Sequence, residues 1–240
     1  MVVFTQDANS SLGVQTLSHF ESLFKVWAAR TLELGQLENI QYILPFENRW
    51  PEIGVTLNHP HGQIYAYPVV PPVPANKQFH AKNYYKENGR SLLEVMIEQE
   101  LIDGKRIIYL GEHAVAFVPA CARYPYEVWL APIKTVASFA DLNDAQRSDL
   151  ARALKTVLMK FDALWARPFT YLMAWFQAPT DNKPHPESHL HAEFYPPYRT
   201  AEKLKFLAGT EIVAGLFAMD CLPEDKVLEL QTIQVDIDHA

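Results

Sequence analysis

The stretch Gly54-Val55-Thr56-Leu57-Asn58-His59-Pro60-His61-Gly62-Gln63-Ile64 is the part of the chain from which its fold is best interpreted. If residues 56–64 are extended, alternate side chains lie on one face, so His59, His61 and Gln63 project together. A cluster of this kind suits a metal ion, a bound phosphate or a nucleophilic imidazole. The alternative is that the two histidines only pack, which is the commoner role of a His-x-His pair.

Hydrophobic periodicity before this stretch predicts a helix and a strand. Residues 16–34 have apolar side chains at helical spacing, and Gly35 ends the pattern. Residues 40–46 predict a strand, and residues 47–51 predict a polar loop that leads into the two histidines.

After the histidines we expect a strand over residues 64–70, stopped by Pro71, Pro72 and Pro74, and then one helical segment over residues 79–102. A long helix starts at Asn143 and ends before Pro168, and a last helix begins at Pro223. Further strands are expected over residues 2–4, 106–110, 114–119, 126–131, 171–176 and 189–195.

A strand that carries His-x-His occurs twice in this order of elements, once with His59 and His61 and again with His189 and His191. The repetition predicts a duplicated α+β unit whose first copy is shorter than its second. We expect His185 and His189, in a polar proline-rich loop, to be solvated, and Trp129, Trp165 and Trp175 to be buried in the core.

Composition limits the classes of function. The 240 residues are 49% hydrophobic and 20% charged, as in an ordinary globular protein, and the net charge of −7 argues against a general nucleic-acid binder. No apolar run reaches the length of a membrane span. Cys121 and Cys221 form no CxxC pair, so we expect neither a disulfide framework nor a cysteine-rich zinc knuckle, and the expected compartment is the cytoplasm.

His61 has the surroundings of a nucleophile. A neutral imidazole attacks phosphorus well if its other nitrogen donates to a fixed acceptor, and the carbonyl of His59 is within reach of that role. Gln63 on the same face offers amide hydrogens to a phosphoryl oxygen without supplying a proton. Asn48, Gly54 and Thr56 in the preceding segment offer an amide, a close backbone approach and a hydroxyl to phosphate oxygens.

The string NHPHGQIYA at residues 58–66 resembles the active-site signature of the galactose-1-phosphate uridylyltransferases, a branch of the histidine-triad superfamily. Other segments resemble the family in the same order, namely residues 45–49, 144–147, 174–179, 189–191 and 203–211. The resemblance implies an α+β, histidine-triad-like fold with a duplicated, mainly antiparallel sheet and helices packed on it. Residues 1–75 would be the C-terminal portion of a truncated first repeat, which transfers the uridylyl group, and residues 76–240 the second repeat.

The resemblance also implies the reaction, a ping-pong transfer of UMP from UDP-glucose to galactose 1-phosphate. His61 matches the nucleophile and Gln63 the neutral donor to the phosphoryl oxygens of the uridylyl-histidine. Asn48, Gly54 and Thr56 match positions that contact the nucleotide phosphates, although the family more often has serine where Thr56 stands. Lys205, Thr210 and Glu211 fall in the segment that holds the hexose phosphate.

The chain departs from the family at both of its metal sites. The structural zinc of the family uses two cysteines, a further histidine and the first histidine of the HPH motif, and only His59 matches that set. A second metal site of some members uses a glutamate and three histidines. At the matching positions stand Lys77, Phe176, His191 and Glu193, so we expect that site to be absent and packing to replace the stability it gives.

The third departure is length, because about the first hundred residues of the family are expected to be missing. One interpretation is an active uridylyltransferase. The alternative is a truncated or split, non-catalytic half that binds UDP-sugars or pairs with an N-terminal partner chain, and an exposed sheet edge would allow such pairing or a homodimer. A nucleotide-sugar or dinucleotide hydrolase is a further alternative, against which Gln63 argues.

Overall fold

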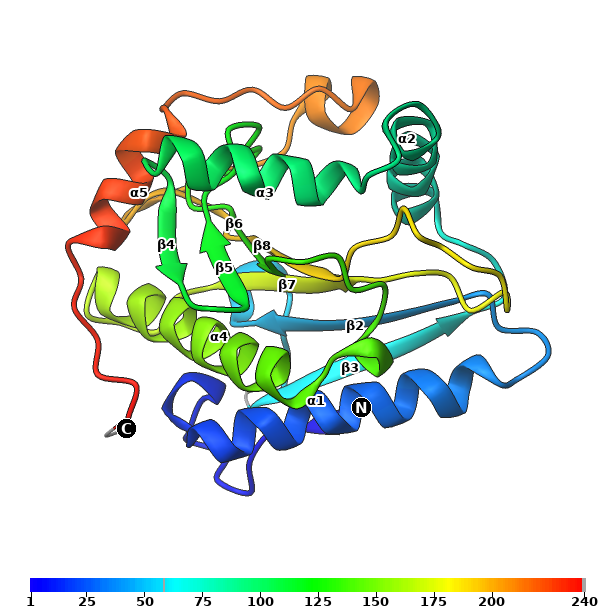
Figure 1. The fold of residues 1–240 in the computed structure, drawn as a ribbon. Coiled ribbons are helices and arrows are strands. Elements are labelled where there is room, and N and C mark those ends of the chain that lie inside the picture. The colour runs from blue at the N-terminus through cyan, green and yellow to red at the C-terminus, as the bar shows by residue number, and fades with distance from the viewer. Residues whose placement is uncertain (58, 239–240) are drawn as a thin grey trace.

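Strands from both ends of the sequence join into one sheet in the order β1-β3-β2-β7-β8-β6-β5-β4 (Figure 1). The structure, a computed structural model, describes residues 1–57 and 59–238. The strands of the sheet are β1 (Val2–Val3), β2 (Tyr42–Arg49), β3 (His61–Tyr67), β4 (Ile107–Leu110), β5 (Ala114–Phe117), β6 (Val128–Pro132), β7 (Tyr171–Phe176) and β8 (His191–Tyr195). All the pairings in the described part of the sheet are antiparallel, which confirms the predicted fold class.

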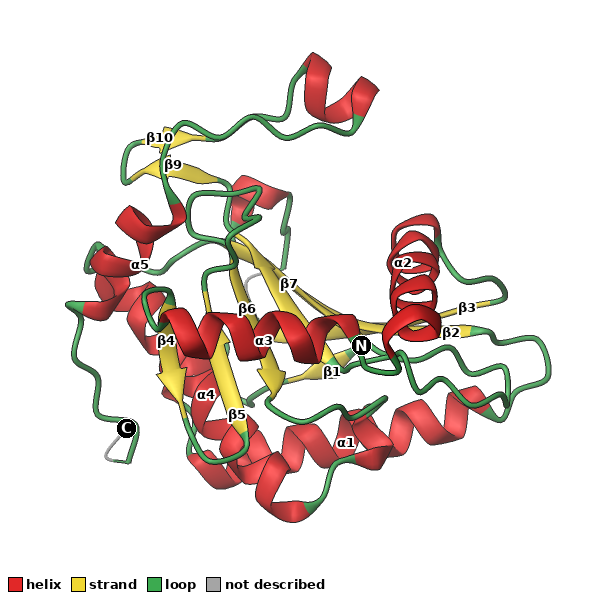
Figure 2. Ribbon diagram, turned by 45° about the horizontal axis from the view of Figure 1, so that its top comes forward, coloured by secondary structure: helices red, strands yellow, loops and turns green. Residues whose placement is uncertain are grey.

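Helices cover the sheet on both faces. The helices are α1 (Leu17–Gly35), α2 (Pro72–Asn88), α3 (Leu92–Asp103), α4 (Asp144–Leu164) and α5 (Pro223–Gln231). Figure 1 shows α1 and α4 on one face of the sheet and α2 and α3 on the other. A small ribbon of β9 (Tyr198–Thr200) and β10 (Lys203–Leu204) leads to a π-helical turn over Thr210–Ala214, at the edge of the molecule in Figure 2.

The main core lies between the sheet and the α1–α4 layer. Phe20, Phe24 and Trp27 recur at helical spacing on α1 and are buried, and Phe24 and Trp27 pack with Trp175 of β7 at ring distances of 5.4 and 5.6 Å. The predicted start of α4 is confirmed by a capping box in which Asn143 and the third residue of the helix satisfy each other's backbone N–H groups.

The register places the site residues of the two predicted repeats on one face of the sheet. Gln63 lies opposite Phe46, Phe46 opposite Ala174, and Ala174 opposite Glu193, so these four residues form one row across β3, β2, β7 and β8. Partners in a row point to the same face. Gln63 and Glu193 therefore share a face at three strand spacings, about 14 Å.

Several predicted boundaries are wrong near the site. Residues 47–49, expected in a loop, belong to β2 because they pair with β7. Residues 56–57 and 59–60 are not part of a strand, since β3 begins only at His61, and residue 58 lies outside the described residues. The single helical segment expected over residues 79–102 is two helices, because Gly89 takes a left-handed conformation (φ 67°) that ends α2.

The proline-rich segment also differs from its prediction. Pro72 and Pro74 were expected only to stop a strand, but they form the first turn of α2, where a missing backbone N–H costs nothing. Within the part of the chain that the structure describes, the helices lack the combination of length and apolarity that crossing a membrane requires.

Candidate active site

A cavity of about 400 Å³ lies where β2 ends and β3 begins. The N-terminal segment, the loop between β2 and β3, and the end of α4 form its walls. It brings together three predicted site residues, His61, His59 and Asn48. Its other lining residues are Ala8, Asn9, Ser10, Ser11, Leu12, Val14, Glu47, Arg49, Trp50, Val55, Leu57, Pro60, Asp162 and Pro168.

The backbone fixes the tautomer of His61. Its Nδ1 lies 2.7 Å from the carbonyl oxygen of His59, the contact that the sequence led us to expect. A carbonyl only accepts hydrogen bonds, so Nδ1 donates its proton and Nε2 of the neutral ring carries the lone pair. The arrangement suits attack on an electrophile by Nε2, followed by stabilisation of the charged ring through the same hydrogen bond.

Close packing explains the glycine that follows this histidine. A Cβ built on Gly62 would lie 2.6 Å from Cζ of Phe4 and 3.2 Å from the carbonyl oxygen of Phe46. Phe4 is fully buried, and its backbone N–H donates to the carbonyl of Pro60 at 2.9 Å. The N-terminal segment is thus held against the His61 strand by a contact that leaves no room for a side chain at residue 62 unless the Phe4 ring moves.

A network of buried charges adjoins the cavity, and sequence reasoning assigned it no role. Arg49 makes a two-pronged ion pair with Asp162 of α4, with N–O distances of 2.7 and 2.9 Å, and its guanidinium lies 5.5 Å from the ring centroid of Tyr171. The hydroxyl of Tyr171 donates to Glu47 at 3.0 Å. Burial raises the pKa of Glu47 to about 7, although Arg49 and Tyr171 oppose the shift.

The loop after β2 carries backbone strain. Trp50 has a φ of 78°, which is rare for a residue with a large side chain, and Gly54 has a φ of 86°. The indole Nε1 of Trp50 and Oδ1 of Asn48 are buried without a hydrogen-bond partner, and both residues line the cavity. Buried polar atoms without a partner are uncommon in native proteins, and here two of them belong to residues of the cavity wall.

The remaining predicted residues divide into two groups. Gln63 is half-buried on β3, while Gly54 and Thr56 are exposed in the loop that leads to His59, and none of the three lines the cavity. Lys205, Thr210 and Glu211 do not line it either.

Within the segment that contains these three residues, the charged side chains of Lys205 and Glu211 bond to backbone groups of the same segment. The ammonium of Lys205 is buried and donates to the carbonyl of Ala218. The carboxylate of Glu211 accepts from the backbone N–H groups of Ala208 and Ala218 at 3.1 and 3.2 Å. In this chain Lys205 and Glu211 stabilise a loop and do not meet His61.

The second His-x-His pair repeats the backbone arrangement of the first. Nδ1 of His191 lies 2.7 Å from the carbonyl of His189, and Nε2 of His189 lies 2.8 Å from the carbonyl of Pro132. In the first pair, Nε2 of His59 lies 2.6 Å from the carbonyl of Thr5. Each first histidine thus donates to a neighbouring segment, and each second histidine donates to the carbonyl of the first.

The surroundings of the second pair correct two predictions. His189 and His185, expected to be solvated, are buried. His185 lies between Asp181 and Glu187 at 2.7 and 3.0 Å. Burial lowers the pKa of His189 to about 4 and, with the nearby Lys77 ammonium, holds that of His191 below its usual value.

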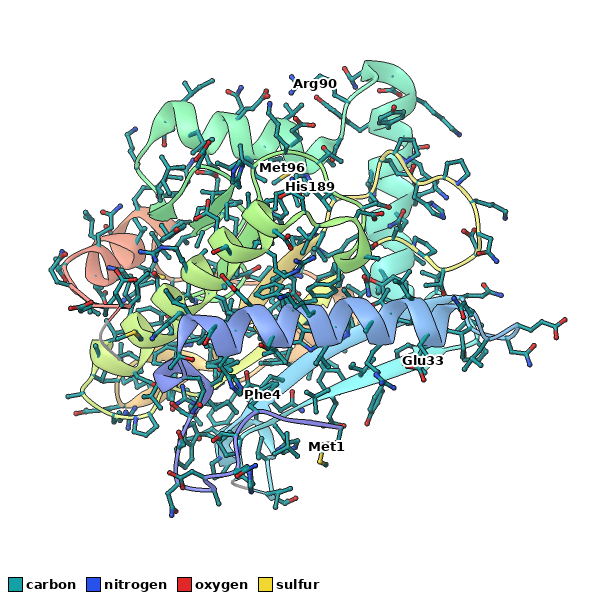
Figure 3. The ribbon with its side chains drawn as sticks, turned by 60° about the horizontal axis from the view of Figure 1, so that its bottom comes forward. Met1, Phe4, Glu33, Arg90, Met96 and His189 are labelled. Carbon is teal, nitrogen blue, oxygen red and sulfur yellow. The ribbon has the colours of Figure 1, made fainter. Side chains whose placement is uncertain are left out.

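A second cavity of about 220 Å³ lies under α2 and α3 beside this pair. Figure 3 shows Met96 of α3 next to His189, and both residues line this cavity. Its walls are mainly apolar, and Trp129, which lines it, is buried as predicted, as is Trp175 in the main core.

The donor set argues against both metal sites that the resemblance implies. Nε2 of His59 is taken by the Thr5 carbonyl, and over residues 1–57 and 59–238 no three His, Cys, Asp or Glu side chains are grouped so as to hold a metal ion. At the second site, Lys77 brings an ammonium and Phe176 an apolar ring, neither of which is a metal ligand. The residues present do not fit either metal.

Sequence profiles match both parts of the chain. The profile described as galactose-1-phosphate uridyl transferase, C-terminal domain, matches residues 77–239, and the profile of the N-terminal domain matches residues 1–71. The expectation that about the first hundred residues of the family are missing is not confirmed, because the N-terminal domain is represented. The predicted domain boundary between residues 75 and 76 stays a prediction.

Individual relatives agree with the profiles. The chain is 36% identical over 99% of its length to the galactose-1-phosphate uridylyltransferase of Thermotoga maritima, of which it spans 74%. It is 34% identical over 89% of its length to that of Haemophilus influenzae and spans 61% of it. A solved structure described as a uridylyltransferase superposes with a TM-score of 0.89 at 33% identity, covering 96% of this chain and 72% of that one.

Proposed function

Because the chain belongs to the galactose-1-phosphate uridylyltransferase family, whose members are nucleotidyltransferases, we propose that it transfers UMP from UDP-glucose to galactose 1-phosphate. The observation that carries the proposal is the fixed tautomer of His61. Its Nε2 carries the lone pair, and His61 lines the larger of the two cavities described above.

The reaction proceeds in two displacements at the same phosphorus. Nε2 of His61 attacks the α-phosphorus of UDP-glucose, a P–N bond forms, and the bond to glucose 1-phosphate breaks. A phosphate oxygen of galactose 1-phosphate then attacks the same phosphorus and releases His61. In the intermediate, Nδ1–H of His61 keeps its bond to the carbonyl of His59, which stabilises the ring without a proton transfer.

Neighbouring residues position the nucleotide. We assign Gln63 to the phosphoryl oxygens of the intermediate, and Asn48, Gly54 and Thr56 to the phosphates of the bound nucleotide. Val55 and Leu57, their neighbours in sequence, line the cavity. No step is assigned to zinc, which the family implies but which His59 alone does not hold.

The position of Lys205, Thr210 and Glu211 leads us to propose a homodimer. These residues do not meet His61 within the chain, yet the segment around them exposes large apolar side chains. Ile212 is 70% exposed and Val213 85%. An apolar segment of this kind suits an interface between copies, in which it would carry the hexose-phosphate residues to the cavity of the other copy.

Mixing two variants tests the dimer. His61→Ala and Lys205→Ala should each be inactive alone, and mixing them with subunit exchange should restore part of the activity, because a mixed dimer contains one complete site. If no activity returns although the mixed dimer forms, the segment does not act in trans. Activity that depends on an added N-terminal partner chain would favour the split-enzyme alternative.

Labelled substrate tests the reaction itself. With UDP-glucose labelled in the α-phosphate, the protein should acquire acid-labile label and release one equivalent of glucose 1-phosphate per active site, and His61→Ala should acquire none. The matched control is His191→Ala, the same change in the second pair, which should still be labelled. Steady release of UMP without an acceptor would instead identify a hydrolase. UDP-glucose binding without any transfer would identify a non-catalytic protein.

We also place the protein in the cytoplasm. Cys121 and Cys221 are both free thiols in the structure, as expected for a reducing compartment.

A further inference from the structure

The ammonium of Lys77, on α2, lies where several groups of the second repeat converge. It donates to Oε1 of Glu193 and is 3.4 Å from Nε2 of His191. The ring centroids of Phe176 and Trp129 lie 4.3 and 5.0 Å from the same nitrogen. A carboxylate, an imidazole lone pair and two aromatic faces are all favourable neighbours for a positive charge.

We propose that the ammonium of Lys77 is the resident cation of the second repeat, and that it fastens α2 to the sheet where some family members hold a metal ion. This inference concerns a different part of the molecule from the proposed reaction and does not depend on it. It also revises the expectation that packing alone replaces the second metal.

Charge balance supports the assignment. Glu193 is fully buried, and an isolated buried carboxylate is costly, so it needs positive charge close by. Lys77 supplies one cation, and Arg123, 2.7 Å from Oε2 of Glu193, supplies the other. Burial would raise the pKa of Glu193, yet its contacts with His191, Lys77 and Arg123 hold that pKa well below its usual value.

The same contacts exclude a divalent ion from this point. Lys77 contacts both the carboxylate and the imidazole, and its charge would repel a second cation. The ring of Phe176 stacks on that of His191, with centroids 5.2 Å apart and an interplanar angle of 17°. Phe176 therefore closes a side of the site from which another imidazole could have reached an ion.

Few other contacts attach α2 to the rest of the molecule. Pro74 is the only buried residue along the described helix. Beyond Lys77, polar contacts join Gln78 to Ser188 at 2.8 and 3.2 Å and Lys82 to Glu187 at 3.7 Å. Because this helix buries so little apolar surface, the loss of its best-paired charge should loosen it selectively.

Hydrogen exchange measures the fastening directly. Lys77→Met keeps the length of the side chain and removes the charge, and we expect it to lower the midpoint of thermal unfolding by roughly 6–12 °C. Amides of residues 72–88 should exchange at least tenfold faster while those of α4 do not. The control is Lys82→Met on the same helix, whose lysine is 46% exposed, and it should behave like wild type. Equal protection of α2 in Lys77→Met and wild type would overturn the proposal.

Converting the site tests the cation assignment. In the double variant Lys77→Glu/Phe176→His, two carboxylates and two imidazoles surround the same point, a set that Zn²⁺ accepts. We expect it to gain about one equivalent of Zn²⁺ per chain by elemental analysis. Added Zn²⁺ should also raise its unfolding temperature. Lys77→Glu alone, which retains the blocking ring, should gain none.

The metal content of the wild-type protein tests the same assignment. After incubation with Zn²⁺, Fe²⁺ or Mn²⁺ and dialysis, its metal content should not change on His191→Ala. If wild type loses a stoichiometric metal ion on that substitution, a metal and not Lys77 is the resident cation. If the double variant folds but binds no ion, the side chains at these positions do not surround a common point, and the proposal is contradicted.

Discussion

The His59–His61 pair and the His189–His191 pair have the same backbone arrangement in two different settings. Both second histidines donate Nδ1–H to the carbonyl of the first at 2.7 Å, which leaves Nε2 as the acceptor. His61 lines the larger cavity, whereas Nε2 of His191 faces the ammonium of Lys77 under α2. A local motif thus sets the tautomer of the imidazole, and distant parts of the chain decide whether its lone pair is available for chemistry.

Two positions beyond each pair stands a polar residue, the neutral Gln63 in the first repeat and the charged Glu193 in the second. Giving residue 63 the charge of its counterpart should have the largest effect on activity. Gln63→Glu would place a carboxylate where a phosphoryl group binds, so we expect uridylyl transfer to fall by about 10²–10³-fold or more. The matched control is Gln78→Glu beside the second cavity, which should leave transfer unchanged. Initial rates with UDP-glucose and galactose 1-phosphate measure both. Near-normal transfer in Gln63→Glu would mean that Gln63 does not contact the phosphoryl group.

The reverse exchange should affect stability instead of transfer. Glu193→Gln leaves the cations of Lys77 and Arg123 beside a neutral amide, and breaking a buried ion pair typically costs about 3–5 kcal/mol. Urea unfolding measures the loss, while transfer per folded molecule should stay close to wild type. A large loss of transfer in folded Glu193→Gln would show that the second repeat takes part in the reaction.

The difference between these two settings marks the limit of what the sequence predicts. The residues around His61 predict its hydrogen bond to the carbonyl of His59, because the two histidines are close in sequence, whereas the antiparallel sheet is implied by the family resemblance. The Arg49–Asp162 pair joins residues 113 apart, and the Lys77–Glu193 pair joins residues 116 apart. Such pairs depend on the folded arrangement, and no local pattern reveals them.

Burial of the second pair was missed for a similar reason. A loop rich in proline and charge predicts exposure, yet His189 is buried and shares a cavity with residues of α2 and α3, which come from a separate part of the sequence. The signal that could have found it is the repeat itself, since His189 and His191 stand where His59 and His61 do. The Arg49 network also had a signal, because Glu47 and Arg49 stand two residues apart at the end of β2, a spacing that places both charges on one face.

Each histidine pair has a buried carboxyl group nearby, and folding shifts the two pKa values in opposite directions. The pKa of Glu47 is raised and that of Glu193 is lowered, and the shift of Glu47 can be tested by varying the pH. The pKa of Glu47 rises from 4.5 to about 7 on folding. The unfolded chain therefore loses this proton first, and stability falls as pH rises from about 4.5 to 7, by about 3 kcal/mol in all. Other groups that face Glu47 are Arg49, Tyr171 and Asp162.

Glu47→Gln removes that titration. The difference in unfolding free energy between Glu47→Gln and wild type should grow in favour of the variant between pH 5 and pH 8, as measured by urea titration at each pH. Histidine titrations are common to both proteins and cancel in the difference. A difference that does not change with pH would show that Glu47 keeps an ordinary pKa in the folded protein.

The smallest expected effect concerns the residue after each second histidine, which is Gly62 in the first pair and Ala192 in the other. In Gly62→Ala the new Cβ would lie 2.6 Å from Cζ of Phe4, so the ring must move, at a cost of about 1–3 kcal/mol. Ala192→Gly, in a fully buried strand, should cost only about 0.5–1 kcal/mol. Thermal unfolding of both variants measures the contrast.

A smaller ring should relieve the clash if Phe4 is its cause. In Gly62→Ala/Phe4→Leu, the cost of the two changes together should therefore be less than the sum of their separate costs. The transfer rate of Gly62→Ala should recover in the same double variant, because Val3 pairs with His61 and a displaced Phe4 disturbs that pairing. Additive costs would mean that the Phe4 ring is not the cause of the cost of Gly62→Ala. The N-terminal segment would then not be what fixes the position of His61.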